Sequence, residues 1–244
     1  MIDENSERES SVQPSAFILD EPENVQRGKS VILWTKILVV LTLAIGLLAE
    51  LVSVSVKPFI QFTLNHMESP ETLGITAAIT ALSLVFLCFV FFFVFLITVF
   101  KFCIWLYITI KNLRKFTKTD FHPVLAVGCT LIPLICGIFD YFIFKDILSH
   151  QEKYLTSPGA KFVPMKQGML KWILILTILN IIPTICSDST TPRIITLAIF
   201  TLLACLYIKA ISAITANEKT LSAIRERDLL NRKIDEILAQ RGNQ

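Results

Sequence analysis

Five long runs of apolar residues dominate this sequence, and they restrict the chain to a fold that lies in a lipid bilayer. Four of them are uninterrupted by helix breakers over most of their length, at about residues 31–56, 72–100, 172–187 and 194–214. A helix needs about 20 apolar residues to cross the hydrocarbon layer, because it rises about 1.5 Å per residue. The composition agrees, with 53% hydrophobic residues and a mean hydropathy of +0.63. We therefore predict an all-α fold, a polytopic membrane helical bundle.

The remaining apolar run, residues 121–148, is interrupted in a way that the other four are not. It contains Pro123, Gly128, Pro133 and Asp140. A proline inside a helix removes a backbone hydrogen bond and clashes with the preceding turn, and glycine loosens the same region. Non-helical backbone at membrane depth is tolerated only where protein or water surrounds it. We expect this segment to be shielded by the other helices and to be broken rather than straight.

The distribution of lysine and arginine tests whether the broken segment crosses the membrane, since these residues prefer the cytoplasmic side of short loops. Three of them precede the first span and one follows it, five lie between Lys101 and Lys118, five lie between Lys145 and Lys171, one precedes residue 194, and seven lie from Lys209 onward. Five crossings would divide them nine against thirteen, whereas four crossings place twenty on one side and two on the other. We therefore predict four spans, both termini in the cytoplasm, and a re-entrant or interfacial segment 121–148.

Two polar segments flank the predicted membrane domain of residues 31–215. Residues 1–30 are acidic, and we expect them to form a disordered cytoplasmic tail. Residues 216–244 contain no proline and repeat apolar positions at helical spacing, which predicts a cytoplasmic amphipathic helix that continues the last span. This helix is suited to binding a protein partner or a second copy of the chain, and equally to docking on its own domain or on the lipid surface.

Residues that carry known chemistry are not arranged in any recognisable motif. His66, His122 and His150 lie in separate segments, so the sequence predicts no metal site. It contains no nucleophile motif and no glycine-rich phosphate loop, which leaves no catalytic residue and no cofactor to propose. Nor do basic residues alternate with exposed aromatic residues, so nucleic acid is not an expected partner.

Two acidic residues within the apolar runs are candidates for a functional role. Asp140 lies in the broken segment, where burying a carboxylate is costly unless it is paired or hydrated. A structural alternative is an ion pair with Lys145 or exposure at the edge of the segment. Glu50 is expected to reach one membrane interface as Lys36 reaches the other, and a functional role would need a partner inside the bundle.

The broken segment also carries a family resemblance. The stretch Phe121-His-Pro-Val-Leu-Ala-Val-Gly128, followed by Ile132-Pro-Leu134 and Tyr141, resembles the signature of an uncharacterised bacterial membrane-domain family. Members of this family carry a Phe-x-Pro-x-x-Ala-Val-Gly stretch and then a Pro-Ile or Pro-Leu step. Here Asp140 stands before Tyr141, where the family has proline. The resemblance implies a location in the bacterial inner membrane and implies no activity.

Three functions are compatible with these features. The missing chemistry and the protruding helix favour a non-enzymatic membrane interaction protein, which could be an accessory subunit, an adaptor or an immunity-type protein. The alternative is a small transporter or channel component that uses segment 121–148 as a pore or gate element. The third is an intramembrane enzyme, which would require a nucleophile and a base to be paired in the structure.

Overall fold

The computed structural model describes residues 22–66, 70–132, 136–156, 160, 162–185 and 193–242. These residues form six helices and no strand: α1 (Glu23–His66), α2 (Pro70–Leu113), α3 (Pro123–Thr130), α4 (Cys136–Leu155), α5 (Gln167–Ile185) and α6 (Arg193–Gly242). The prediction of an all-α fold is therefore confirmed over the described ranges. The helix α1 begins at Glu23, inside the segment that we assigned to the tail, because no proline or glycine cluster separates that segment from the apolar run.

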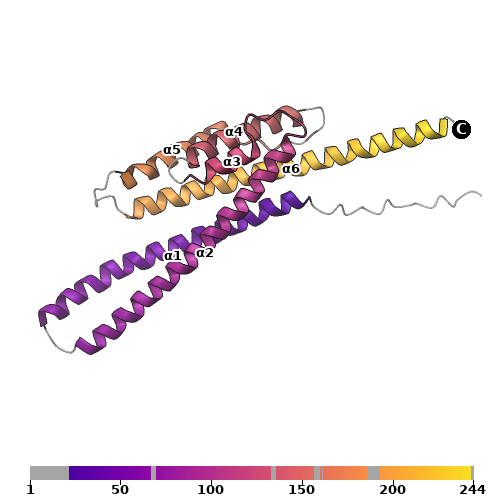
Figure 1. Ribbon diagram of the computed structural model, residues 1–244. Helices are drawn as coiled ribbons and strands as arrows, with labels where there is room; N and C mark the ends of the chain where they lie inside the picture. Colours follow the sequence, from indigo (N-terminus) through magenta and orange to yellow (C-terminus); the bar gives the residue numbers. More distant parts are fainter. Residues whose placement is uncertain are drawn as a thin grey trace, which may run out of the picture.

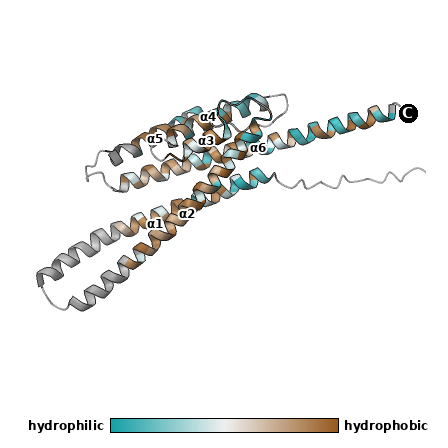
Figure 2. Ribbon diagram, in the orientation of Figure 1, coloured by the Kyte–Doolittle hydropathy of each residue, from teal (hydrophilic) through white to brown (hydrophobic). Residues whose placement is uncertain are grey.

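Three helices in the described part of the chain are long and apolar enough to cross a membrane. The stretches concerned are Glu23–Ala49 of α1, Val85–Leu113 of α2 and Ile195–Arg241 of α6, and each contains an apolar run of 18 residues. The apolar part of α5, Gln167–Asn180, is shorter. In Figure 2 the brown, hydrophobic residues fill the middle of α2, while teal residues gather at the start of α1 and along the far half of α6. These features show that the chain is a helical membrane protein.

The phenylalanine residues of α2 support the same conclusion. Phe86, Phe89 and Phe92 are 67%, 60% and 53% exposed, and no other part of the described chain covers them. A row of exposed aromatic residues of this size is unfavourable in water, since each one leaves a large apolar surface hydrated. In a bilayer the same row faces the lipid chains.

The helix α1 runs antiparallel to α6 and also packs against α2 (Figure 1). Near the start of α1, a Cβ atom on Gly28 would overlap the hydroxyl group of Thr215 in α6. Farther along, a Cβ atom on Gly46 would lie 2.8 Å from Cδ2 of Leu197. The two contacts are equally spaced on the two helices, as expected for antiparallel helices in close contact. Small residues permit this close approach in membrane helices.

The segment 121–148 forms the short helix α3 and most of α4, which run in opposite directions. The start of α3 is fixed by His122, whose ring accepts a hydrogen bond from the backbone N–H of Val124, and by Pro123 in its first turn. The backbone of Phe121 hydrogen-bonds to Asp146 near the far end of the segment, whereas Thr130 hydrogen-bonds to Cys103 close to Asp140. Both ends of the segment therefore lie at the same end of the bundle.

A compact core joins α2, α4, α5 and α6. Its members that are entirely buried include Trp105 of α2, Phe144 and Ile147 of α4, Ile173 of α5, and Ile211 and Ile214 of α6. The helices α4 and α6 run parallel, because Asp140 contacts Tyr207 and Gln151 contacts Ile214. This core places several polar residues in buried positions, and they form the candidate site.

Candidate functional site

Asp140, the residue singled out in the broken segment, is buried between α4 and α6. It is only 5% exposed, and its Oδ2 atom accepts a hydrogen bond of 2.7 Å from the hydroxyl group of Tyr207. Its Oδ1 atom is buried without a hydrogen-bond partner among the described residues. The Tyr207 ring itself packs edge-on against Phe102 and Phe144. The partner of Asp140 is therefore a tyrosine of another helix, and not the Lys145 that we considered.

The other residues named from the sequence do not join Asp140. Pro123 is buried in the first turn of α3, and its role there is to start the helix. Nothing lies within 4 Å of the position that a Cβ atom would take on Gly128. Pro133 lies outside the described residues, and so does the side chain of Glu50, although its backbone belongs to α1.

A second buried acid, Glu218, forms a polar cluster with residues of α1 and α2. The Nδ2 atom of Asn24 lies 2.6 Å from both carboxylate oxygens of Glu218 and 3.1 Å from the hydroxyl oxygen of Thr109. All three side chains are buried, and the Oδ1 atom of Asn24 has no partner in the described part of the chain. They line a cavity of about 70 Å³ together with Arg225 and neighbouring residues. The cluster therefore joins three helices at one point.

The carboxyl group of Glu218 is poised to change its charge near neutral pH. Glu218 lies just beyond Ile214, where the apolar part of α6 ends, and is thus outside the membrane-spanning segment. Burial raises the pKa of Glu218 from 4.5 to about 7, while the hydrogen bonds from Asn24 and Thr109 act in the opposite direction. Because burial of an unpaired carboxylate is unfavourable, folding favours the protonated form.

A network of amide groups lies next to this cluster. The Nδ2 atom of Asn217 donates to Oε1 of Gln151 over 3.2 Å, and Nε2 of Gln151 donates to the backbone oxygen of Ile214 over 3.3 Å. The side-chain oxygen of Asn217 also accepts a 2.8 Å hydrogen bond from the backbone N–H of Val163. This network attaches the segment between α4 and α5 to α6, at the level where α6 leaves the bundle.

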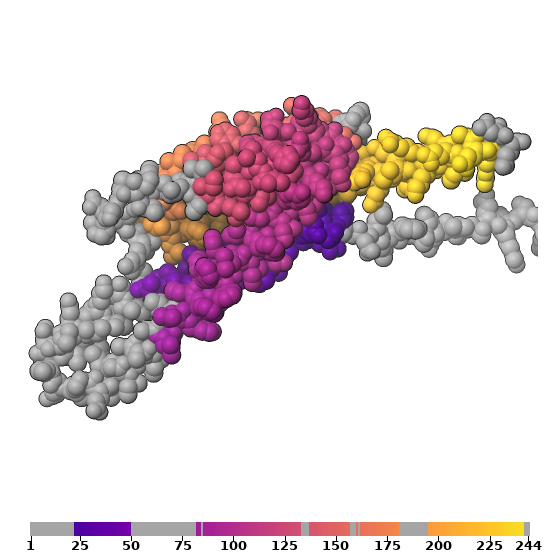
Figure 3. All heavy atoms as spheres, in the orientation of Figure 1, coloured from indigo at the N-terminus to yellow at the C-terminus, as the bar shows by residue number. Residues whose placement is uncertain are grey.

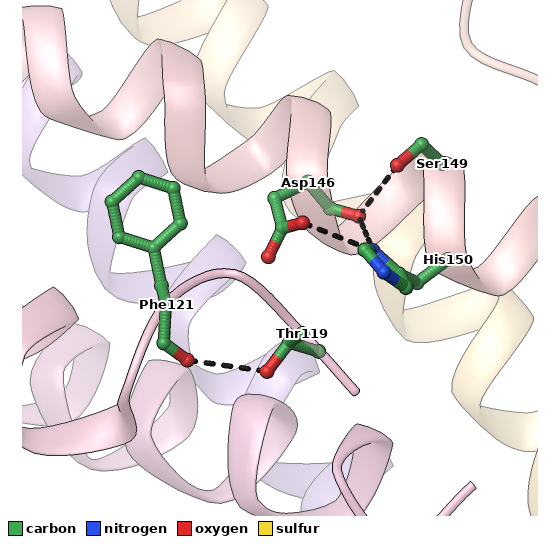
Figure 4. A network of polar contacts seen from close by, with 5 residues as sticks. All are labelled: Thr119, Phe121, Asp146, Ser149 and His150. Carbon is green, nitrogen blue, oxygen red and sulfur yellow. Dashed lines mark hydrogen bonds and ion pairs between the residues drawn. The ribbon is translucent and has the colours of Figure 1, made fainter. Parts of the chain in front are cut away.

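Asp146 organises the connection between α2 and α3 (Figure 4). Its carboxylate lies 2.9 Å from Nδ1 of His150, one turn later in α4, and it accepts hydrogen bonds from the backbone of Asp120 and Phe121. Thr119 closes the same turn by donating to the backbone oxygen of Phe121 over 3.1 Å. These contacts explain why Asp146 is buried, and they give it a structural role.

Asp140 and Glu218 do not form a continuous polar path. Between Asp140 and Glu218 the core is filled by Phe144, Ile147 and Ile211, all of which are completely buried. Polar groups that transfer ions or protons must be within hydrogen-bonding reach of one another or of water. In the ranges that the structure describes, no group of three or more His, Cys, Asp or Glu side chains is placed to hold a metal ion.

Glu218 and Asn24 were not predicted as site residues, although the sequence contained a signal for one of them. Glu218 follows Ile214 by four residues and precedes Leu221 by three, so it occupies the same helical face as these two buried residues. A carboxylate on the buried face of a helix indicates a polar partner. Asn24 carries no such signal, because its partner is in a distant helix.

Comparison with known proteins adds no further identification. No family model, no curated protein and no solved structure matched this chain. The fold alone therefore defines its class, which is a helical membrane protein with a buried polar cluster where its helices leave the apolar layer.

Proposed function

We propose that this chain is a non-enzymatic integral membrane interaction protein, acting as an accessory subunit, an adaptor or an immunity-type protein. The proposal rests on the exposure of the C-terminal part of α6. Residues 225–241 are all exposed, and Figure 3 shows this part of α6, in yellow, projecting beyond the other described helices. An uncovered helix with an apolar face is a common means of binding another protein.

The apolar face of this projecting helix points away from the face that packs on the bundle. Leu230, Ile234, Ile237 and Leu238 are 61%, 52%, 52% and 61% exposed. At about 100° per residue they form one stripe, which is rotated by roughly a third of a turn or more from Leu221. Leu221 is 4% exposed and packs on the core. The stripe is therefore available to a partner and not required by the chain's own bundle.

Lipid is a less suitable partner for this stripe than protein. The helix α6 is continuous from Arg193 to Gly242. Leu230 lies 16 residues beyond Ile214, which corresponds to about 24 Å along the helix axis. A stripe that begins so far from the end of the apolar segment is separated from the bilayer unless the helix bends, and an interfacial helix lies flat in the membrane plane.

The membrane topology that accompanies this proposal has four spans and both termini in the cytoplasm, with segment 121–148 re-entrant or interfacial. The distribution of lysine and arginine supports it, and so does the opposite direction of α3 and α4. The resemblance described above supports the bacterial inner membrane as the location. The stripe on α6 then lies in the cytoplasm, where the partner is a protein or a second copy of this chain.

A matched pair of substitutions tests the proposed interaction. Ile234→Asp places a charge in the middle of the stripe, and Leu229→Asp places the same charge about a third of a turn away. We expect a defined partner to co-purify in fixed ratio with the wild type and with Leu229→Asp, and to be lost with Ile234→Asp. Equal recovery with both variants would overturn the proposal.

The alternative, a small transporter or channel component, is favoured by one observation only. The Oδ1 atom of Asp140 is buried without a partner in the described residues, as expected of a group that binds a passing ion or proton. The apolar core between Asp140 and Glu218 opposes it. A flux of ions or protons into proteoliposomes that is abolished by Asp140→Asn would support this alternative.

A further inference from the structure

A groove with an apolar wall and two basic residues lies between α1 and α2. Its volume is about 480 Å³, and it is lined by Arg27 and Ser30 of α1 and by five residues of α2 between Leu96 and Ile104. Pockets for small molecules usually measure about 300–1,000 Å³, so the groove has room for a phosphate head group and the first part of an acyl chain. Nothing in the proposed interaction of α6 uses this groove.

The apolar wall of the groove belongs to the lipid-facing surface of α2. Phe100 is 67% exposed, and Leu96 and Ile97 are 45% and 36% exposed. They lie at the end of the uncharged run that begins at residue 72. The groove is therefore open to the acyl chains of the bilayer, and its residues are suited to contact with them.

The basic residues lie beside this apolar wall, where the uncharged run of α2 ends. Lys101 is the first charged residue after the run, and no hydrogen bond or ion pair of its side chain is found within the described ranges. Arg27 pairs with Glu23 one turn earlier in α1, and it remains 34% exposed. An arginine can bind a second oxyanion while it keeps one carboxylate partner, because its guanidinium group has five N–H donors.

We propose that this groove binds one anionic phospholipid, with its phosphate between Arg27 and Lys101 and an acyl chain along Phe100 and Leu96. Two cations at the boundary of the apolar layer, next to a groove between spanning helices, match the charge and the amphipathic shape of such a lipid. A zwitterionic lipid is a poorer match, because its own ammonium group would approach the same two cations. A free phosphate ion would use the two cations and leave the apolar wall without a function.

Native mass spectrometry of the purified full-length chain tests this site. The protein is stripped of lipid in detergent and then titrated with phosphatidylglycerol or phosphatidylcholine. We expect one phosphatidylglycerol to be retained at least about tenfold more strongly than phosphatidylcholine, since each Lys or Arg near the head group strengthens the binding of an anionic lipid. The double variant Arg27→Gln/Lys101→Gln should lose this preference.

A control just beyond the end of α2 separates this site from general attraction between charges. Lys115→Gln removes an exposed cation near the end of α2, outside the groove, and should keep the preference. Lys101→Gln alone should reduce the preference without disturbing the Arg27–Glu23 pair, so the test does not depend on the folding of the double variant. Leu96→Asp should weaken lipid binding through the apolar wall.

Three results would overturn the proposal. The first is equal retention of the two lipids by the wild type. The second is an unchanged preference in a folded Lys101→Gln variant. The third is displacement of phosphatidylglycerol by millimolar inorganic phosphate, because that result would assign the two cations to a free anion.

Discussion

The side-chain amide of Asn24 in α1 lies 2.6 Å from both carboxylate oxygens of Glu218 in α6, although 194 positions separate the two residues in the sequence. The same amide also donates to Thr109 of α2 over 3.1 Å. One asparagine thus connects three long helices at the point where α6 leaves the bundle. The projecting stripe on α6 begins at Leu230, 12 residues beyond this connection.

The first prediction concerns the pH dependence of stability. The pKa of Glu218 is raised to about 7 in the folded protein, so the protonated side chain favours the folded state. This contribution to the free energy of unfolding is fully present below the ordinary pKa of 4.5 and is lost as the pH rises through 7. The difference is on the order of 3 kcal/mol. We expect the melting temperature in detergent to be lower at about pH 8 than at about pH 5, and Glu218→Gln to remove most of this difference.

The exposed Glu226 provides the control for that measurement. Glu226→Gln changes the same charge on the same helix, outside the polar cluster, and should leave the pH dependence as it is in the wild type. If the melting temperatures of Glu218→Gln and of the wild type change equally with pH, the pH dependence arises from a group other than Glu218.

A second prediction tests the contact between α1 and α6. Gly28→Ala should lower the free energy of unfolding by about 1–3 kcal/mol, because the added methyl group overlaps Thr215 and approaches Trp105. Thr215→Ala removes the overlapping atoms and should recover part of the loss in the double variant. Gly128→Ala serves as a control, since nothing lies within 4 Å of its Cβ position and alanine favours the helix by about 1 kcal/mol. Thermal unfolding in detergent measures all three, and equal melting temperatures for Gly28→Ala and Gly128→Ala would contradict the close contact.

The sequence was sufficient for the class of protein and insufficient for its buried contacts. Apolar runs and their breakers are local features, so the all-α membrane fold and the separation of α3 from α4 could be predicted from them. Asp140 could be singled out for the same reason, because an acid within an apolar run is conspicuous. Its partner could not be predicted, since Tyr207 lies 67 positions away and reaches Asp140 only through the packing of α4 on α6.

A third prediction addresses that buried pair. Tyr207→Phe removes the hydroxyl group that donates a hydrogen bond to Asp140. The buried carboxyl group of Asp140 then has no hydrogen-bond partner among the described residues. We expect a loss of about 1–3 kcal/mol in the free energy of unfolding. Asp140→Leu combined with Tyr207→Phe should cost less than the sum of the two single changes, because both partners are then apolar. Additive losses in this double-mutant cycle would show that the hydrogen bond contributes nothing to stability.

The last prediction decides between four and five membrane crossings. The backbone of Phe121 hydrogen-bonds to Asp146, so the two ends of the broken segment lie at one end of the bundle, and the exposed Glu152 follows directly in α4. With the native cysteines replaced, Glu152→Cys should therefore react with an impermeant maleimide from the same side as Lys115→Cys, which lies in the connection between α2 and α3. Asp188→Cys, in the predicted loop between residues 187 and 194, should react from the other side. Labelling of Glu152→Cys and Lys115→Cys from opposite sides would mean that segment 121–148 crosses the bilayer, which would place the two termini on opposite sides of the membrane.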